Sequence, residues 1–378
     1  MNHLSLRFML CVMILCLVMA ACSSLTPQPP RVEEISFQSG SFHVVGDLRL
    51  PAGKGPFPVV VFVHGSGTDD RTNGGFALPI MERMARAGYA TFSWDTPGSG
   101  ESTGEFSRTR RLHEKAQILL DAIEVIKARP DIDPQWIGLN GGSQAGYVMP
   151  LALSRSQDIA FMICGACPGM SGVDQSTYQA MALAICEGVP EEQAGRRTEL
   201  LAELDAARTY ETYEEYVHYR EVITSLFAIA PNAPHGYGFE VVPREAWLAN
   251  DPEIEDWWNP IDVIRHTTIP VLAILGDRDP RIDPIQAAIA YREALEQAGN
   301  PRSRVELVPG ANHDMIVSDT GCPDDDNRRL MQYVQSKGYA SLSEAQEALR
   351  KDPGLISEFP FAPGFLDTLE QWLKDLRR

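Results

Sequence analysis

Basic residues are scarce in this sequence: 33 Lys and Arg stand against 51 Asp and Glu, which gives a formal net charge of −18 at pH 7. An acidic surface repels polyanions, so we expect no nucleic-acid partner and no charge-driven binding to anionic lipid headgroups. The sequence also lacks metal-ligand spacings, a Walker loop and a dinucleotide-binding fingerprint. We therefore expect no cofactor and no metal site.

The apolar run near the start of the chain is short for a membrane span. It covers residues 8–21, follows Arg7 and stops before Cys22, which fits the core of a signal peptide. Residues 19–22 (Met-Ala-Ala-Cys) resemble a bacterial lipobox, which implies cleavage after residue 21, lipidation of Cys22 and an anchor in the cell envelope. Ser23 resembles the pattern of outer-membrane sorting, facing the periplasm. The alternatives are a plain secretory signal, giving a periplasmic or secreted protein, and an uncleaved anchor.

Cysteine is also sparse, with seven residues, of which three fall within the first 22 positions. The others are Cys164, Cys167, Cys186 and Cys322. Cys164 and Cys167 end an apolar run and have no second ligand pair in the sequence. A disulfide or packed thiols are therefore favoured over a zinc site at this pair.

The most informative stretch is 137–146, an apolar strand that runs into a serine surrounded by small residues. A nucleophile elbow places its serine on a sharp strand-to-helix turn with a strained backbone, so the flanking side chains must be tiny. The small neighbours are Gly141, Gly142, Ala145 and Gly146. We predict that Ser143 is a catalytic nucleophile; the alternative is a Gly-rich turn that holds a serine for ordinary reasons.

A nucleophile of this kind needs an acid and a histidine, which follow it in that order along the chain. The apolar run 270–275 is followed by a loop that holds Asp279, and such loops carry the chemistry of α/β sheets. We predict Asp279 as the acid, with Asp277 and Asp283 as rivals in the same loop.

His313 is the predicted general base. The chain has eight histidines, and His313 is the one that lies after Asp279. It follows the strand-like segment 304–308 and a turn. From that loop it can accept the proton of Ser143 while the acid fixes its tautomer.

Backbone N–H groups should stabilise the oxyanion that forms during acyl transfer. One is expected from Gln144, at the N-terminus of a helix. The other is expected from Ser66, in the loop 64–68 that follows the apolar run 58–63. His64 is the first residue of this segment, and we interpret it as a structural residue that holds the loop.

The ordered motifs resemble those of the α/β-hydrolases, and within that fold the bacterial esterases of the dienelactone-hydrolase and prolyl-oligopeptidase-like group. They are residues 64–67 with Asp70-Arg71, 95–102, 141–146, 276–279 and 310–313. The resemblance implies a serine hydrolase that cleaves a small-molecule carboxylic ester through an acyl-enzyme. The main alternative is a peptidase of the oligopeptidase-like branch, an acyltransferase or a thioesterase. A non-catalytic ligand-binding lipoprotein is the third interpretation.

Two positions depart from the family pattern. Ala145 stands two residues after the serine, where Gly is usual, and we expect the variation to be tolerated because Gly146 follows. Thr96-Pro97 stand where an Arg-Gly pair is common. We therefore interpret the Asp95 loop as structural.

The alternation of apolar and amphipathic segments predicts an α/β fold with a mostly parallel sheet covered by helices on both faces. Residues 32–37 and 41–50 alternate polar and apolar side chains, which predicts an antiparallel hairpin at the edge of the sheet. The expected strands are 58–63, 90–94, 136–140, 159–164, 270–275 and 303–308. The expected helices are 76–87, 113–128, 144–155, 284–298 and 364–376.

The chain divides into a short leader and one large domain. We expect a signal peptide at 1–21, a lipidated tether at 22–31 and an α/β-hydrolase domain at 32–378. Residues 172–258 are helical in pattern and acidic, and we expect this insert to form a cap over the serine. A second insert at 319–361 is expected to border the same cleft.

Overall fold

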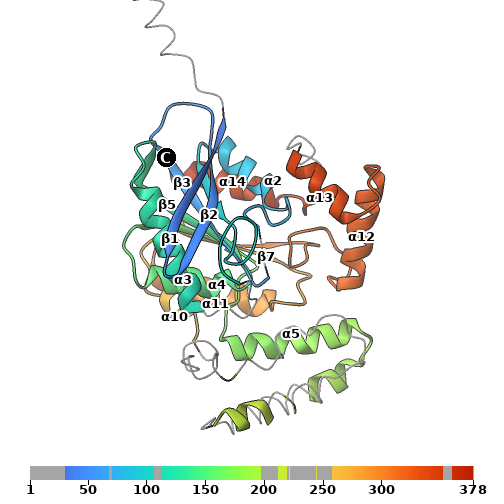
Figure 1. Cartoon of the computed structure of the whole chain (residues 1–378). Helices are drawn as coiled ribbons and strands as arrows, with labels where there is room; N and C mark the ends of the chain where they lie inside the picture. Colours follow the sequence, from blue (N-terminus) through green and yellow to red (C-terminus); the bar gives the residue numbers. More distant parts are fainter. Residues whose placement is uncertain are drawn as a thin grey trace, which may run out of the picture.

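The protein is built around one eight-stranded sheet with the strand order β1-β2-β4-β3-β5-β6-β7-β8 (Figure 1). The computed structural model describes residues 30–67, 70–105, 112–196, 212–218, 221, 244, 258–351 and 360–377. The strands are β1 (Arg31–Ser39), β2 (Phe42–Leu50), β3 (Phe57–Val63), β4 (Ala90–Trp94), β5 (Ile132–Gly142), β6 (Ile159–Gly165), β7 (Val271–Gly276) and β8 (Arg304–Val308). The predicted signal peptide, Cys22 and most of the predicted cap insert lie outside the described residues.

The sheet is mostly parallel, which confirms the predicted fold class. β1 and β2 form an antiparallel edge hairpin, β2 is antiparallel to β4, and the other pairs are parallel. β5 begins at Ile132, earlier than the predicted residue 136, because Ile132 pairs with Phe57 of β3. The short polar segment between Ile132 and Ile137 therefore belongs to the strand and not to a loop.

Helices cover both faces of the sheet, so its parallel strands are buried on both sides (Figure 1). The covering helices are α2 (Leu78–Arg86), α3 (Leu112–Lys127), α4 (Ala145–Leu153), α10 (Ile261–Ile264), α11 (Pro284–Ala298) and α14 (Phe365–Leu376). Because side chains alternate along a strand, Val59 and Val61 of β3 join the core under α3, α4 and α11. Val60 and Phe62 join the core under α2 and α14.

Three further helices belong to the two predicted inserts. They are α5 (Gly172–Cys186), α12 (Pro323–Ser336) and α13 (Leu342–Lys351). Figure 1 shows α5, α12 and α13 outside the layers that cover the sheet. The full extent of the inserts stays a prediction. Within the described ranges, none of the helices has the length and apolar character needed to cross a membrane.

Candidate active site

Ser143 stands on the sharp turn between β5 and α4. Its φ is +56°, in the left-handed region that non-glycine residues rarely adopt. Its amide donates hydrogen bonds to the carbonyl oxygens of Gly165 and Ala166, at the end of β6, at 3.3 and 3.1 Å. Strained backbone of this kind persists only where the surroundings impose it, and it concentrates at functional sites.

The small residues around Ser143 are required by packing. A Cβ on Gly141 would lie 2.6 Å from the Cβ of Ala145 and 2.8 Å from the carbonyl oxygen of Val63. A Cβ on Gly146 would lie 2.7 Å from the Cβ of Cys167. Ala145 therefore fits in place of the usual glycine because residue 141, which faces it, has no side chain.

Asp279, in the loop after β7, contacts His313. Its Oδ2 lies 2.7 Å from His313 Nδ1, and the two side chains are 1% and 9% exposed. Its Oδ1 accepts hydrogen bonds from the amides of Arg281 and Ile282. With Nδ1–H donating to the carboxylate, Nε2 of His313 is the nitrogen left to act as a base.

The two rival carboxylates have other partners. Asp277 accepts a hydrogen bond from the amide of Gly310 at 2.7 Å, which ties the loops after β7 and β8 together. Asp283 is the N-cap of α11 and accepts from the amides at positions 285 and 286. Both contacts are structural, so Asp279 is the one carboxylate of the three that contacts the histidine.

Opposing influences act on the pKa of His313. Burial is the largest and lowers the pKa, because it disfavours the charged imidazolium. The charge and hydrogen bond of Asp279, together with the charge of Asp314, raise it, and the net result is a pKa above the ordinary histidine value. A raised pKa makes the imidazole a stronger base when it takes up a proton.

Ser143 lies on the same edge of the sheet as this pair. Residues 143, 279 and 313 follow β5, β7 and β8, and the carboxyl ends of parallel strands share one edge. The structure thus brings Asp279 and His313 into contact. The hydrogen bond between Ser143 and His313 stays a prediction.

The loop after β3 packs directly on the elbow. A Cβ on Gly65 would lie 3.1 Å from the carbonyl oxygen of Gly142 and 3.4 Å from the Cβ of Ser143. Ser66 follows Gly65, and Gln144 is the N-cap residue of α4. Both predicted oxyanion donors therefore belong to segments that meet at Ser143, and their role stays a prediction.

His64 anchors this loop. Its Nε2 donates to the carbonyl oxygen of Trp94 at 2.6 Å, and its ring stands edge-on to the indole of the same residue. Burial, the largest influence, lowers the pKa of His64 to about 4. The imidazole is therefore neutral at pH 7, in the tautomer that carries its proton on Nε2.

Asp95 is buried in an ion-pair network. Its side chain accepts from the backbone amide and the guanidinium of Arg71 and from the amide of Glu101. Arg71 also pairs with Asp47 and Glu101. Burial, the largest influence, raises the pKa of Asp95, but these hydrogen bonds and the Arg71 charge outweigh it and lower the pKa. Asp95 thus has the structural role that its sequence context indicates.

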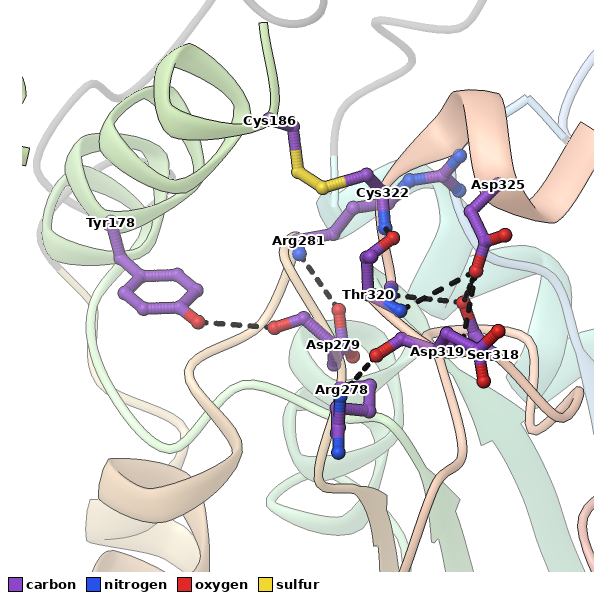
Figure 2. Close-up of a disulfide and its surroundings, with 11 residues drawn as sticks. Tyr178, Cys186, Arg278, Asp279, Arg281, Ser318, Asp319, Thr320, Cys322 and Asp325 are labelled. Carbon is purple, nitrogen blue, oxygen red and sulfur yellow. Dashed lines mark hydrogen bonds between the residues drawn. A yellow bond between two sulfur atoms is a disulfide. The ribbon is translucent and has the colours of Figure 1, made fainter. Parts of the chain in front are cut away.

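The four cysteines that the structure describes form two free thiols and one disulfide. Cys164 and Cys167 are buried free thiols, so packing is the correct interpretation of this pair. Cys186 and Cys322 form a disulfide that closes 136 residues (Figure 2). Disulfides persist in oxidising compartments, and the export expected from the N-terminal residues stays a prediction. Among the described residues, no group of three or more His, Cys, Asp or Glu side chains could hold a metal ion.

This disulfide joins the two inserts beside the predicted acid (Figure 2). Cys186 ends α5, and Cys322 is the N-cap residue of α12. The hydroxyl of Tyr178 on α5 donates to the carbonyl oxygen of Asp279 at 3.0 Å. No local pattern predicts this pairing, because the two cysteines meet only once both inserts fold against the Asp279 loop.

The start of the second insert is packed against the same loop. A Cβ on Gly321 would lie 1.6 Å from the carbonyl oxygen of Arg278, and the φ of Gly321 is +76°. The side chain of Asp325 accepts hydrogen bonds from the hydroxyl of Ser318 and the amide of Asp319, as Figure 2 shows. The acid loop is therefore supported from α5 on one side and from the 318–325 turn on the other.

Breaking the disulfide is expected to lower the free energy of unfolding by about 2–4 kcal/mol, since a cross-link over a long loop restricts the unfolded chain. Guanidinium unfolding with and without reductant measures the change. The double variant Cys186→Ser/Cys322→Ser is the control and should be insensitive to reductant, because Cys164 and Cys167 carry no disulfide. Equal unfolding midpoints for the oxidised and the reduced wild type would contradict the expectation.

The family model of the alpha/beta hydrolase family matches residues 60–325. The chain belongs to the alpha/beta hydrolase family. This hydrolase is similar to Esterase EstD of Thermotoga maritima, with 24% identity over 298 residues. That alignment covers 76% of the chain and 62% of EstD, less than two thirds of the relative's length.

Solved structures are also similar to this hydrolase. The Pyrococcus furiosus esterase Pf2001 has 15% identity and a TM-score of 0.48, over 81% of this chain and 91% of that one. Est1E from Butyrivibrio proteoclasticus, solved with ferulic acid bound, has 14% identity and a TM-score of 0.47. Its alignment covers 91% of this chain and 97% of Est1E.

Proposed function

We propose that this hydrolase cleaves carboxylic esters of small or medium acyl chains, with Ser143 as nucleophile, His313 as general base and Asp279 as the residue that orients the base. The observation that carries the proposal is the 2.7 Å contact between Asp279 and His313, on the sheet edge where a serine is held at a φ of +56°. The similarity to Esterase EstD supports the same reaction class.

The first half-reaction forms an acyl-enzyme. Ser143 Oγ attacks the ester carbonyl carbon while its proton passes to Nε2 of His313. The imidazolium is stabilised by the Asp279 carboxylate, which keeps Nδ1 protonated. Collapse of the tetrahedral intermediate breaks the bond to the alcohol oxygen, and the alcohol leaves with the proton from Nε2.

The second half-reaction returns the free enzyme. Water attacks the acyl carbonyl as His313 Nε2 takes its proton. Collapse of the second intermediate breaks the bond to Ser143 Oγ, which regains a proton from the imidazolium, and the carboxylic acid is released. In both halves the negative oxygen faces the amides of Ser66 and Gln144, which are fixed before the reaction and need no reorganisation.

Competing substrate classes and an active-site probe together test the proposal. We expect kcat/KM for p-nitrophenyl acetate and butyrate to exceed kcat/KM for aminoacyl p-nitroanilides by at least about 100-fold. A site that favours esters should discriminate between the two substrate classes by a factor of this order. A fluorophosphonate should label Ser143 covalently, and peptide mapping locates the adduct.

The outcomes separate the alternatives. Anilides that turn over well while esters do not would replace the esterase by a peptidase. Aminolysis or thioester cleavage that outpaces ester hydrolysis would identify an acyltransferase or a thioesterase. A protein that hydrolyses none of these substrates and takes no label at Ser143 would be a ligand-binding member of the family.

A further inference from the structure

Lys115 of α3 reaches the two segments that meet at Ser143. Its Nζ donates to the carbonyl oxygen of Gly65, at 3.4 Å, and to the side-chain oxygen Oε1 of Gln144. The lysine is half-buried and comes from a helix that packs on the neighbouring α4. None of the motifs that identify the triad includes this residue.

Each partner of Lys115 adjoins a proposed oxyanion donor. The carbonyl of Gly65 belongs to the same peptide group as the amide nitrogen of Ser66. Gln144 carries the other donor on its own backbone, and its side chain is the group that Lys115 binds. One ammonium group therefore bridges the loop after β3 and the start of α4.

The bridge acts on a part of the chain that needs support. The backbone at Gly65 lies close to the elbow, since a Cβ on this glycine would be only 3.1 Å from the carbonyl oxygen of Gly142. Glycine allows more backbone conformations than other residues, so this loop needs further contacts to stay in one position. An oxyanion hole works by holding its donors in place before charge develops, so a displacement of either amide weakens it. A cation that binds both segments limits their relative motion.

The positive charge of Lys115 also suits a site where a negative oxygen forms. Hydrogen bonding of an ammonium to the Gly65 carbonyl polarises that peptide group and makes the adjoining Ser66 N–H a better donor. The charge disfavours a second cation nearby, and after burial it contributes to the lowered pKa of His64. Lys115 thus places a positive charge next to the segments that would hold the negative oxygen.

We propose that Lys115 is a positioning residue of the oxyanion hole, which fixes the Ser66 and Gln144 amides relative to each other. The inference rests on the proposed function, because it assigns these amides to the oxyanion. Lys115 touches neither the nucleophile nor the substrate in this role. It acts through the Gly65 carbonyl and the Gln144 side chain.

The test replaces Lys115 with methionine, which keeps the length of the side chain and removes the charge and the donors. We expect kcat for p-nitrophenyl butyrate to fall about tenfold while KM changes less than about twofold, because the loss falls on the transition state. Affinity for an alkyl boronic acid, which mimics the tetrahedral intermediate, should fall in parallel with kcat/KM. Lys115→Arg, which keeps a charge and donors, should retain more activity.

A lysine on the same helix provides the matched control. Lys127 pairs with Glu124 and Asp158, at the end of α3 opposite to Lys115. Lys127→Met should leave kcat and boronate affinity unchanged. The double variant Lys115→Met/Gln144→Met should lose no more than Lys115→Met alone, because the two side chains act through one contact.

A second measurement tests the inference without reference to turnover. Amide hydrogen exchange in peptides that cover residues 63–67 and 143–147 should be faster in Lys115→Met than in Lys127→Met. Unchanged exchange in both peptides, or an unchanged kcat in an enzyme that hydrolyses esters at Ser143, would overturn the role of Lys115 and leave the proposed function standing. Absence of any Ser143-dependent hydrolysis in the wild type would overturn the proposed function, and the assignment of Lys115 to an oxyanion hole with it.

Discussion

Replacing Ser143 with alanine is expected to reduce ester turnover by at least about four orders of magnitude, because the hydroxyl is the group that forms the acyl-enzyme. The fold should survive, since the change removes one oxygen atom and leaves the elbow glycines in place. Steady-state kinetics with p-nitrophenyl butyrate and loss of fluorophosphonate labelling measure the effect. Residual activity above about a tenth of the wild-type rate would show that another residue is the nucleophile.

The strain at this position gives the experiment a matched control. Ser143 has a φ of +56°, where glycine is at ease and other residues are not. Ser143→Gly should therefore be inactive like Ser143→Ala, yet more stable by about 1 kcal/mol. Equal unfolding midpoints for the glycine and alanine variants would mean that the turn stores no backbone strain.

Replacing Asp279 with asparagine is expected to lower kcat by about three to four orders of magnitude, because an amide does not hold His313 in the tautomer that leaves Nε2 as a base. The pH profile should change as well. In the wild type the Asp279 charge helps to raise the pKa of His313, so kcat/KM falls as the pH drops through that raised value and the base is protonated. Without the charge the pKa of His313 falls, so the drop in residual kcat/KM on the acidic side should occur at a lower pH than in the wild type.

Two neighbouring carboxylates serve as controls for this variant. Asp277→Asn and Asp283→Asn remove a loop contact and a helix N-cap, so each should cost about 1 kcal/mol of stability and little of kcat. Measured side by side, the three variants assign the acid. If Asp283→Asn were the most damaging to kcat, Asp279 would not be the acid of the site.

Much of the fold could be read from the sequence because its signals are local. The buried strands are continuous apolar runs. The strands and helices of the sheet layers lie within two residues of their predicted bounds, apart from β5 and from α10, the short helix at Ile261–Ile264 that the sequence pattern did not predict. The signal for the elbow is equally local, since its small residues stand within three positions of Ser143, although Val63 and Cys167 supply some of the atoms that limit them. The order serine, acid, histidine then selected His313 by position alone.

The choice among carboxylates needed the tertiary structure. Asp277, Asp279 and Asp283 share one loop and one chemical character, and only the approach of His313 from the loop after β8 separates them. The same holds for the disulfide between Cys186 and Cys322, which lie 136 residues apart. It also holds for Lys115, a helical lysine with no local sign of its two partners.

Sequence alone determined the strands, the helices, the elbow and the order of the candidate catalytic residues, because hydrophobic periodicity and small-residue spacing act over a few positions. The tertiary structure decided which side chains from distant segments share a hydrogen bond or a cross-link. Such contacts depend on how the loops at the carboxyl edge of the sheet pack together, and that packing has no counterpart in any short stretch of sequence.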